Sequence, residues 1–256
     1  MHLSAPLPIN PRCVDMSLDH KTGCLICGEE LVYEKETDQL ECFYCHQVYD
    51  SNAKCRNGHY VCDKCHSLPA MEMIENYCIS SKSEDPLELA LTLMRNPKMK
   101  MHGPEHHFLV PAVLLASYFN IKKDYKEKAT KIRMAKKRAT QILGGFCGFY
   151  GNCGAAVGTG IFVSLITNAT PLSITDWKLA NLVTAKSLLT IAEHGGPGCC
   201  KRNTFLALLE AADFVKKNFG VTLEVNKGLE CEFYDLNNEC LRQNCPFYPY
   251  TLVNMM

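Results

Sequence analysis

Four closely spaced pairs of metal-type ligands near the N-terminus constrain this chain more than any other feature. The pairs are Cys24/Cys27, Cys42/Cys45, Cys55/His59 and Cys62/Cys65. Two thiolates on a tight Cys-x2-Cys turn bind one zinc ion at about 2.3 Å, and eight ligands complete two closed tetrahedral sites. Because residues 21–68 contain few apolar side chains, we expect two structural zinc ions to stabilise their fold.

The spacing does not decide which two ligand pairs share each metal ion, and two arrangements are possible. A sequential arrangement joins the first pair to the second and the third to the fourth. A crossed arrangement joins the first to the third and the second to the fourth. The run "CRNGHYVCDKC" resembles the central ligand run of RING-type cross-brace domains, so we favour the crossed pairing. The final RING ligand pair is missing, which argues against ubiquitin-ligase function.

Composition indicates a reduced, intracellular protein. The chain has 16 cysteines and nine histidines, and its start lacks the charged and apolar regions of a signal peptide. Cytosolic thiols stay reduced, so the cysteines indicate metal binding or thiol chemistry rather than a disulfide framework. Lys+Arg and Asp+Glu are both 27, which gives no indication of nucleic-acid binding. No apolar run is long enough for a bilayer, and we expect a cytoplasmic protein with no membrane association.

The sequence predicts a mainly α protein, in which a small two-metal module of the treble-clef or cross-brace type precedes a helical domain. We divide the chain into a tail (1–20), a zinc module (21–68), a linker (69–84) and a helical, cysteine-rich domain (85–256). Capping residues, prolines and apolar periodicity predict the helices of that domain. They are expected at 85–96, 104–120, 123–143, 153–167, 175–196 and 203–220.

Thiols and imidazoles gather where these helices begin. Cys153 begins one helix, Cys199 and Cys200 precede another, and "MHGPEHH" (101–107) begins a third. Helix N-termini expose unpaired N–H groups and a partial positive charge, which stabilise thiolates and anionic clusters. If the three starts converge, they form an electropositive pocket lined with thiol and imidazole groups.

Such a pocket suits an iron–sulfur cluster or reactive thiolates. The candidate cofactor ligands are Cys147, Cys153, Cys199, Cys200, Cys231, Cys240 and Cys245. We expect Cys153 or Cys200 to be the reactive thiol and His106 to act in acid–base chemistry. His102, His106 and His107 are further candidate metal ligands. The resulting hypothesis is a redox or sulfur-handling protein with a redox or sulfur-transfer partner protein.

Two other functions remain open at this stage. The helix at 123–143 is strongly basic, so the chain could instead be a non-enzymatic zinc protein that docks an acidic protein or RNA. Alternatively, the "HGPEHH" histidines could support a metal-dependent hydrolase or transferase.

The motifs "MHGPEHHFLVPAVLLA", "CGxxGxCGAAVGTGIF" and "GGPGCCKRNTF" resemble an uncharacterised domain family of anaerobic archaea and bacteria. That resemblance covers roughly residues 86–250 and implies no particular activity. The cysteines at 147, 153, 199 and 200 are also similar to a redox family named for a C…GCAxxG…C…C pattern, although Asn152 replaces its glycine. The second resemblance implies redox chemistry.

Overall fold

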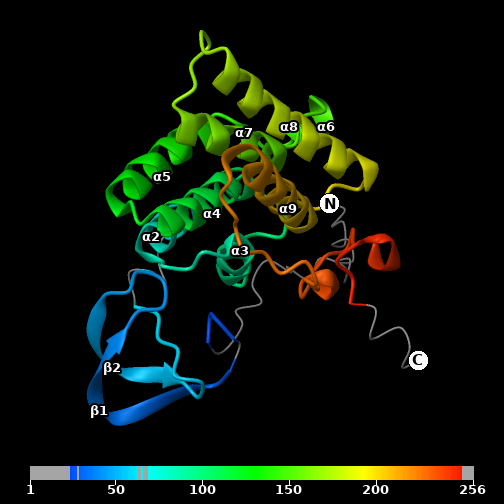
Figure 1. Ribbon diagram of the computed structural model, residues 1–256. Coiled ribbons are helices and arrows are strands. Elements are labelled where there is room, and N and C mark those ends of the chain that lie inside the picture. Colours follow the sequence, from blue (N-terminus) through cyan, green and yellow to red (C-terminus); the bar gives the residue numbers. More distant parts are fainter. Residues whose placement is uncertain (1–23, 28, 63–64, 66–68, 250–256) are drawn as a thin grey trace, which may run out of the picture.

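A β-hairpin and a bundle of helices make up the chain (Figure 1). The computed structural model describes residues 24–27, 29–62, 65 and 69–249. The predicted tail 1–20 lies outside the described residues. The protein is mainly α, as the sequence predicts, and the cysteine-rich hairpin module precedes the helical part.

The hairpin consists of two antiparallel strands, β1 (Leu31–Glu41) and β2 (Val48–Cys55). Leu31 pairs with Cys55 at one end and Glu41 pairs with Val48 at the other, with an irregularity between Tyr33 and Asp38. Most of the side chains on both strands are exposed or half-buried. The hairpin therefore has little apolar core of its own, in line with a module that depends on metal.

Helix α4 (Glu105–Lys122) lies at the centre of the helical part. Its apolar residues occur around its whole circumference, and 14 of its 18 residues are buried. Pro111 lies inside this helix. The helices α2, α3, α5, α7 and α9 all pack against α4. Their bounds, together with those of the remaining helices, are α2 Ala70–Ser80, α3 Pro86–Met94, α5 Tyr125–Ala139, α6 Phe146–Phe149, α7 Gly154–Thr167, α8 Thr175–Glu193 and α9 Cys200–Phe219.

The segment 69–84 differs from the expected linker because it contains helix α2. Met73, Ile74 and Cys78 are fully buried, and α2 packs against α4 and α5. Tyr77 of α2 also contacts Tyr44 of the cysteine-rich module, with ring centroids 5.7 Å apart. The apolar face of α2 is thus a part of the core that joins the two portions of the chain. None of the described helices has the length and apolar character needed to cross a membrane.

The segment after α9 is irregular. It contains the short 3-10 helices η1 (Tyr234–Leu236) and η2 (Arg242–Asn244). The backbone N–H of Cys231 donates to the Phe247 carbonyl at 2.6 Å, which ties the two ends of this segment together. Phe247 in turn packs edge-on against Phe205 of α9, so the segment is anchored to the helical core.

Candidate functional site: two metal-ligand groups and a pocket at three helix starts

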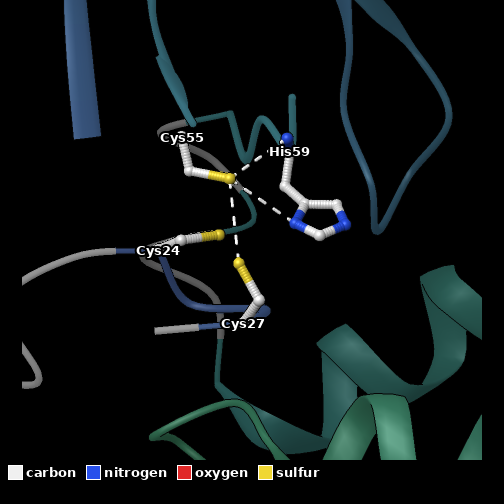
Figure 2. Close-up of side chains that lie close together, drawn as sticks. All are labelled: Cys24, Cys27, Cys55 and His59. Carbon is white, nitrogen blue, oxygen red and sulfur yellow. Dashed lines mark hydrogen bonds between the residues drawn. The ribbon is translucent and has the colours of Figure 1, made fainter. Parts of the chain in front are cut away.

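The eight ligands of the N-terminal module form two groups in the crossed arrangement. In each group the ligand atoms all lie within 4.8 Å of one another. The first group, shown in Figure 2, contains side chains that point toward a common centre. Its members are Cys24, Cys27, Cys55 and His59, and those of the second are Cys42, Cys45, Cys62 and Cys65.

The distances within these groups fit a tetrahedral ion. The Sγ atoms of Cys27 and Cys55 are 3.8 Å apart, and those of Cys45 and Cys62 are 3.9 Å apart. A tetrahedral zinc with bonds of about 2.3 Å separates its thiolates by about 3.8 Å. Nδ1 of His59 lies 3.5 Å from the Cys55 sulfur, so this nitrogen is the ligand atom of the imidazole. All eight ligand positions are used, and neither group leaves an open position for chemistry.

The register of the hairpin explains the crossed pairing. Cys55 lies opposite Leu31 at the start of β1, only a few residues after the Cys24–Cys27 turn. The turn that follows β1 is bound by the next segment of chain, because the Phe43 N–H donates to the Tyr60 carbonyl at 2.9 Å. The fourth ligand pair therefore lies beside the second.

The three predicted helix starts meet at one pocket of about 440 Å³, here called the helix-start pocket. The starts of α4, α7 and α9 all contribute to its wall, and the short helix α6 closes one side. The side chains that carry chemistry in this pocket are those of His102, His106, His107, Cys147, Cys153, Cys200 and Asn203.

His106 lines the helix-start pocket and has one unpartnered ring nitrogen. Its side chain is 1% exposed, and Nδ1 donates to the Gly103 carbonyl at 3.2 Å. Nε2 is buried and has no hydrogen-bond partner in the described part of the chain. Burial, together with the nearby positive charge of Lys201, lowers the pKa of His106 to about 3. The imidazole is therefore neutral, and Nε2 carries a free lone pair.

His107 has the same tautomer but a different environment. Its Nδ1 donates to the Ile142 carbonyl at 3.0 Å, and burial lowers its pKa. The ring packs directly on the backbone of Gly154, where a Cβ atom would lie 2.2 Å from the imidazole Cδ2. Because both pocket imidazoles are held neutral, the positive potential of the pocket comes from the helix ends rather than from histidine.

Two thiols of this pocket have contrasting environments. Cys153 is the N-cap of α7, and its sulfur accepts a hydrogen bond from Asn203 Nδ2 at 3.4 Å. The sulfur is therefore held at the start of α7 by a side chain of α9. Cys200 is the first residue of α9, and burial raises the pKa of its thiol to about 11.

The three histidines do not gather as a metal site. His102 donates through Nε2 to Asn237 Oδ1 at 3.2 Å, while His106 and His107 each donate through Nδ1 to a backbone carbonyl. Within the described residues, none of them belongs to a group of three or more ligand atoms lying within 4.8 Å of one another.

The seven candidate cofactor cysteines are divided between two cavities. Cys147, Cys153 and Cys200 line the helix-start pocket. A second, narrower cavity on the other side of the α9 start is lined by Cys199, Cys231, Cys240 and Cys245. The adjacent residues Cys199 and Cys200 thus face different cavities.

One polar residue of these cavities, Asn203, was not anticipated from the sequence. It lies one helical turn after Cys199 and Cys200, and that spacing is the signal that could have identified it. Lys201 and Arg202, which follow the same cysteine pair, line the narrow cavity and are both nearly fully buried.

Several basic side chains of helix α5 bind other parts of the same protein. Lys128 donates to the Ser81 carbonyl and to Asn120 Oδ1, both at 2.8 Å. Arg133 and Lys136 both pair with Glu75 of α2. These contacts fasten α5 to the rest of the protein, which reduces the charge that is available to an acidic partner.

The fold and these sites define a helical, cysteine-rich domain joined to a metal-binding hairpin module. The profile of a family of unknown function, DUF5714, matches residues 74–248, and the chain belongs to this family. The match begins inside α2 and ends after the last of the C-terminal cysteines, so it includes both cavities. No curated protein and no solved structure matches the chain.

Proposed function

We propose that this protein handles sulfur or performs thiol redox chemistry, with Cys153 as the reacting group of the helix-start pocket. An iron–sulfur centre belongs to the same proposal. The observation that carries the proposal is the meeting of Cys153, Cys200 and His106 at one pocket of about 440 Å³. The N-terminal metal groups are closed and have a structural role.

Cys153 is suited to act as the nucleophile. The thiolate is the reactive form of cysteine. The Cys153 sulfur lies at the N-terminal end of α7 and accepts a hydrogen bond from the Asn203 amide. The Cys153 side chain is largely buried, so a reagent reaches the sulfur only through the pocket.

Cys200 and His106 have complementary proton roles. With a pKa of about 11, the Cys200 thiol keeps its proton at neutral pH and can donate a hydrogen bond. His106 Nε2 can only accept a hydrogen bond, because its Nδ1 carries the proton of the neutral ring. A ligand that carries an S–H group satisfies this nitrogen.

A hydropersulfide, R–S–SH, is the simplest ligand that uses all three groups. Its terminal S–H donates to His106 while the Cys153 thiolate attacks the terminal sulfur. The S–S bond of the donor breaks as the new S–S bond forms, so Cys153 becomes a persulfide. The leaving R–S⁻ accepts a hydrogen bond from the Cys200 thiol and is released as a thiolate. No external oxidant or reductant is needed for this transfer.

The test uses the full zinc-loaded chain and inorganic polysulfide as the sulfur donor. We expect mass spectrometry to find one added sulfur atom on the peptide that contains Cys153. The Cys153→Ser variant should lose this modification, and Asn203→Ala should slow it about tenfold, because a hydrogen bond to a charged sulfur contributes about 1.5 kcal/mol.

A matched control is Cys78→Ala, which removes a fully buried thiol of α2 that lies outside the pocket. This variant should accept sulfur at the wild-type rate. Equal labelling of Cys153 and other free thiols, or unchanged labelling of the Cys153→Ser chain, would refute the proposal.

A further inference from the structure

The narrow cavity beside the start of α9 carries a thiol set that the proposed sulfur chemistry does not use. Three of its cysteines come from the irregular segment after α9, and the fourth is the N-cap of α9. We call these four residues the C-terminal thiol set. They are Cys199, Cys231, Cys240 and Cys245.

The separation of these sulfur atoms distinguishes this set from the two N-terminal groups. Among the described residues, no three of these thiols lie within 4.8 Å of one another, although all four line one cavity. A single tetrahedral zinc requires thiolates about 3.8 Å apart. An iron–sulfur cluster also takes four cysteine ligands, and it holds them further apart because each thiolate binds a different corner or end of a multi-atom core.

Three of the four sulfurs of the C-terminal thiol set accept a backbone hydrogen bond from a residue two or three positions further along the chain. The same local geometry occurs in the first N-terminal metal group, where the Ile26 N–H donates to Cys24 Sγ at 3.4 Å. Such N–H···S bonds stabilise metal-bound thiolates and tune cluster potentials. The donors are Phe233 to Cys231 (3.4 Å), Arg242 to Cys240 (3.4 Å) and Arg202 to Cys199 (3.5 Å).

A side chain adds a further donor to this set. Asn237 is 4% exposed, and its Nδ2 donates to Cys199 Sγ at 3.5 Å. Its Oδ1 accepts from His102 and from the Glu239 backbone, which fixes the orientation of the amide. The Cys199 sulfur therefore receives two hydrogen bonds.

Two buried cations face the same cavity. Lys201 and Arg202 are 1% and 3% exposed, and no carboxylate of the described residues lies within 4.0 Å of either charged group. The Lys201 ammonium lies 4.9 Å from the centre of the Phe233 ring. Its hydrogen-bond partner among the described residues is the Met99 carbonyl at 3.5 Å, and the charge of Glu105 attracts it from beyond ion-pair distance. Buried charges need a counter-charge, and a cluster bound by four thiolates carries a net negative charge.

We propose that the C-terminal thiol set binds an iron–sulfur cluster, with Lys201 and Arg202 as its buried counter-charges. The start of α9 and the irregular segment 231–248 together enclose the cavity that the four thiols line. The cluster ligand Cys199 is followed directly by Cys200 of the helix-start pocket, which places the cluster next to that pocket. The inference does not depend on sulfur transfer to Cys153, because the two sites share no cysteine.

The first measurement is made on the full chain, purified without oxygen and then incubated with ferrous iron and sulfide. We expect two zinc ions per chain, iron and acid-labile sulfide in near-equal amounts, and an electron paramagnetic resonance signal after reduction. The absence of iron and sulfide, or a third zinc in their place, would overturn the proposal whatever the variants do.

Variants assign the ligands. Cys240→Ser and Cys245→Ser, tested separately, should each lower the iron and sulfide content at least several-fold. The matched controls Cys78→Ala and Cys200→Ser should keep the wild-type content. Retention of iron in both ligand variants would overturn the assignment, and circular dichroism confirms that each variant retains its helices. A chain that binds the cluster but accepts no sulfur on Cys153 would refute only the proposed function.

Discussion

Substitution of Gly154 by alanine tests whether the helix-start pocket has the packing described here. A Cβ atom at this position would lie 2.2 Å from His107 Cδ2, whereas ordinary contacts begin at 3.4 Å. The imidazole must therefore shift by more than an ångström. Since Nδ1 lies 3.0 Å from the Ile142 carbonyl, a shift away from that oxygen breaks the hydrogen bond.

The magnitude follows from three contributions. Overpacking of a well-packed site costs about 1–3 kcal/mol, and the lost hydrogen bond costs about 0.5–1.5 kcal/mol. Replacement of glycine by alanine in a helix returns up to about 1 kcal/mol. We therefore expect Gly154→Ala to lower the free energy of unfolding by about 1–3 kcal/mol and to slow sulfur acceptance by Cys153.

The assay is denaturant unfolding of the zinc-loaded chain, followed by the circular dichroism of the helices. The matched control is Gly148→Ala in α6, where a Cβ atom would meet nothing within 4 Å. This substitution should leave stability unchanged or raise it by about 0.4–1 kcal/mol. Equal effects of the two substitutions, or a stabilising effect of Gly154→Ala, would refute the reasoning.

The remaining predictions concern metal and buried charge. A strong zinc chelator should unfold the hairpin module while α4 to α9 keep their circular dichroism, because few apolar groups hold that module together; loss of the entire helical signal would contradict this. Burial lowers the pKa of Lys128 from 10.5 to about 8. Between these two pH values the unfolded chain binds more protons than the folded chain, so the free energy of unfolding rises with pH across that range, by at most about 3 kcal/mol. Lys128→Met should remove this rise in denaturant titrations, whereas an equal rise in both proteins would contradict the assignment. Asn120→Ala should lower the free energy of unfolding by about 2–4 kcal/mol, because it removes an acceptor of Lys128 and two hydrogen bonds to backbone carbonyls. The control Asn181→Ala, at an exposed position, should lower it by no more than about 0.5 kcal/mol.

Local sequence signals were sufficient to predict most of the helices. Asp85 caps α3 and precedes a proline, as the pattern predicts, and α7 begins directly after Cys153. Residues 69–84 were misjudged because polar residues such as Glu72, Glu75 and Asn76 conceal the buried positions of α2. The burial of that face depends on α4 and α5, which no local pattern shows.

The pairing of the metal ligands also required the fold. Cys-x2-Cys spacing identifies each pair, because a tight turn alone brings two thiolates together. Which pairs share a group depends on the register that places Cys55 opposite Leu31. The RING-like run favoured the same arrangement through resemblance, without a geometric reason.

The amino-acid sequence by itself determined the mainly helical class, the metal-type ligand pairs and the concentration of thiols at helix starts. All three depend on spacing and capping within a few residues. Only the tertiary structure decided that the starts of α4, α7 and α9 meet at one pocket, and that the adjacent residues Cys199 and Cys200 face separate cavities. The physical reason is that side-chain direction on a packed helix depends on its neighbours, and those neighbours are distant in the sequence.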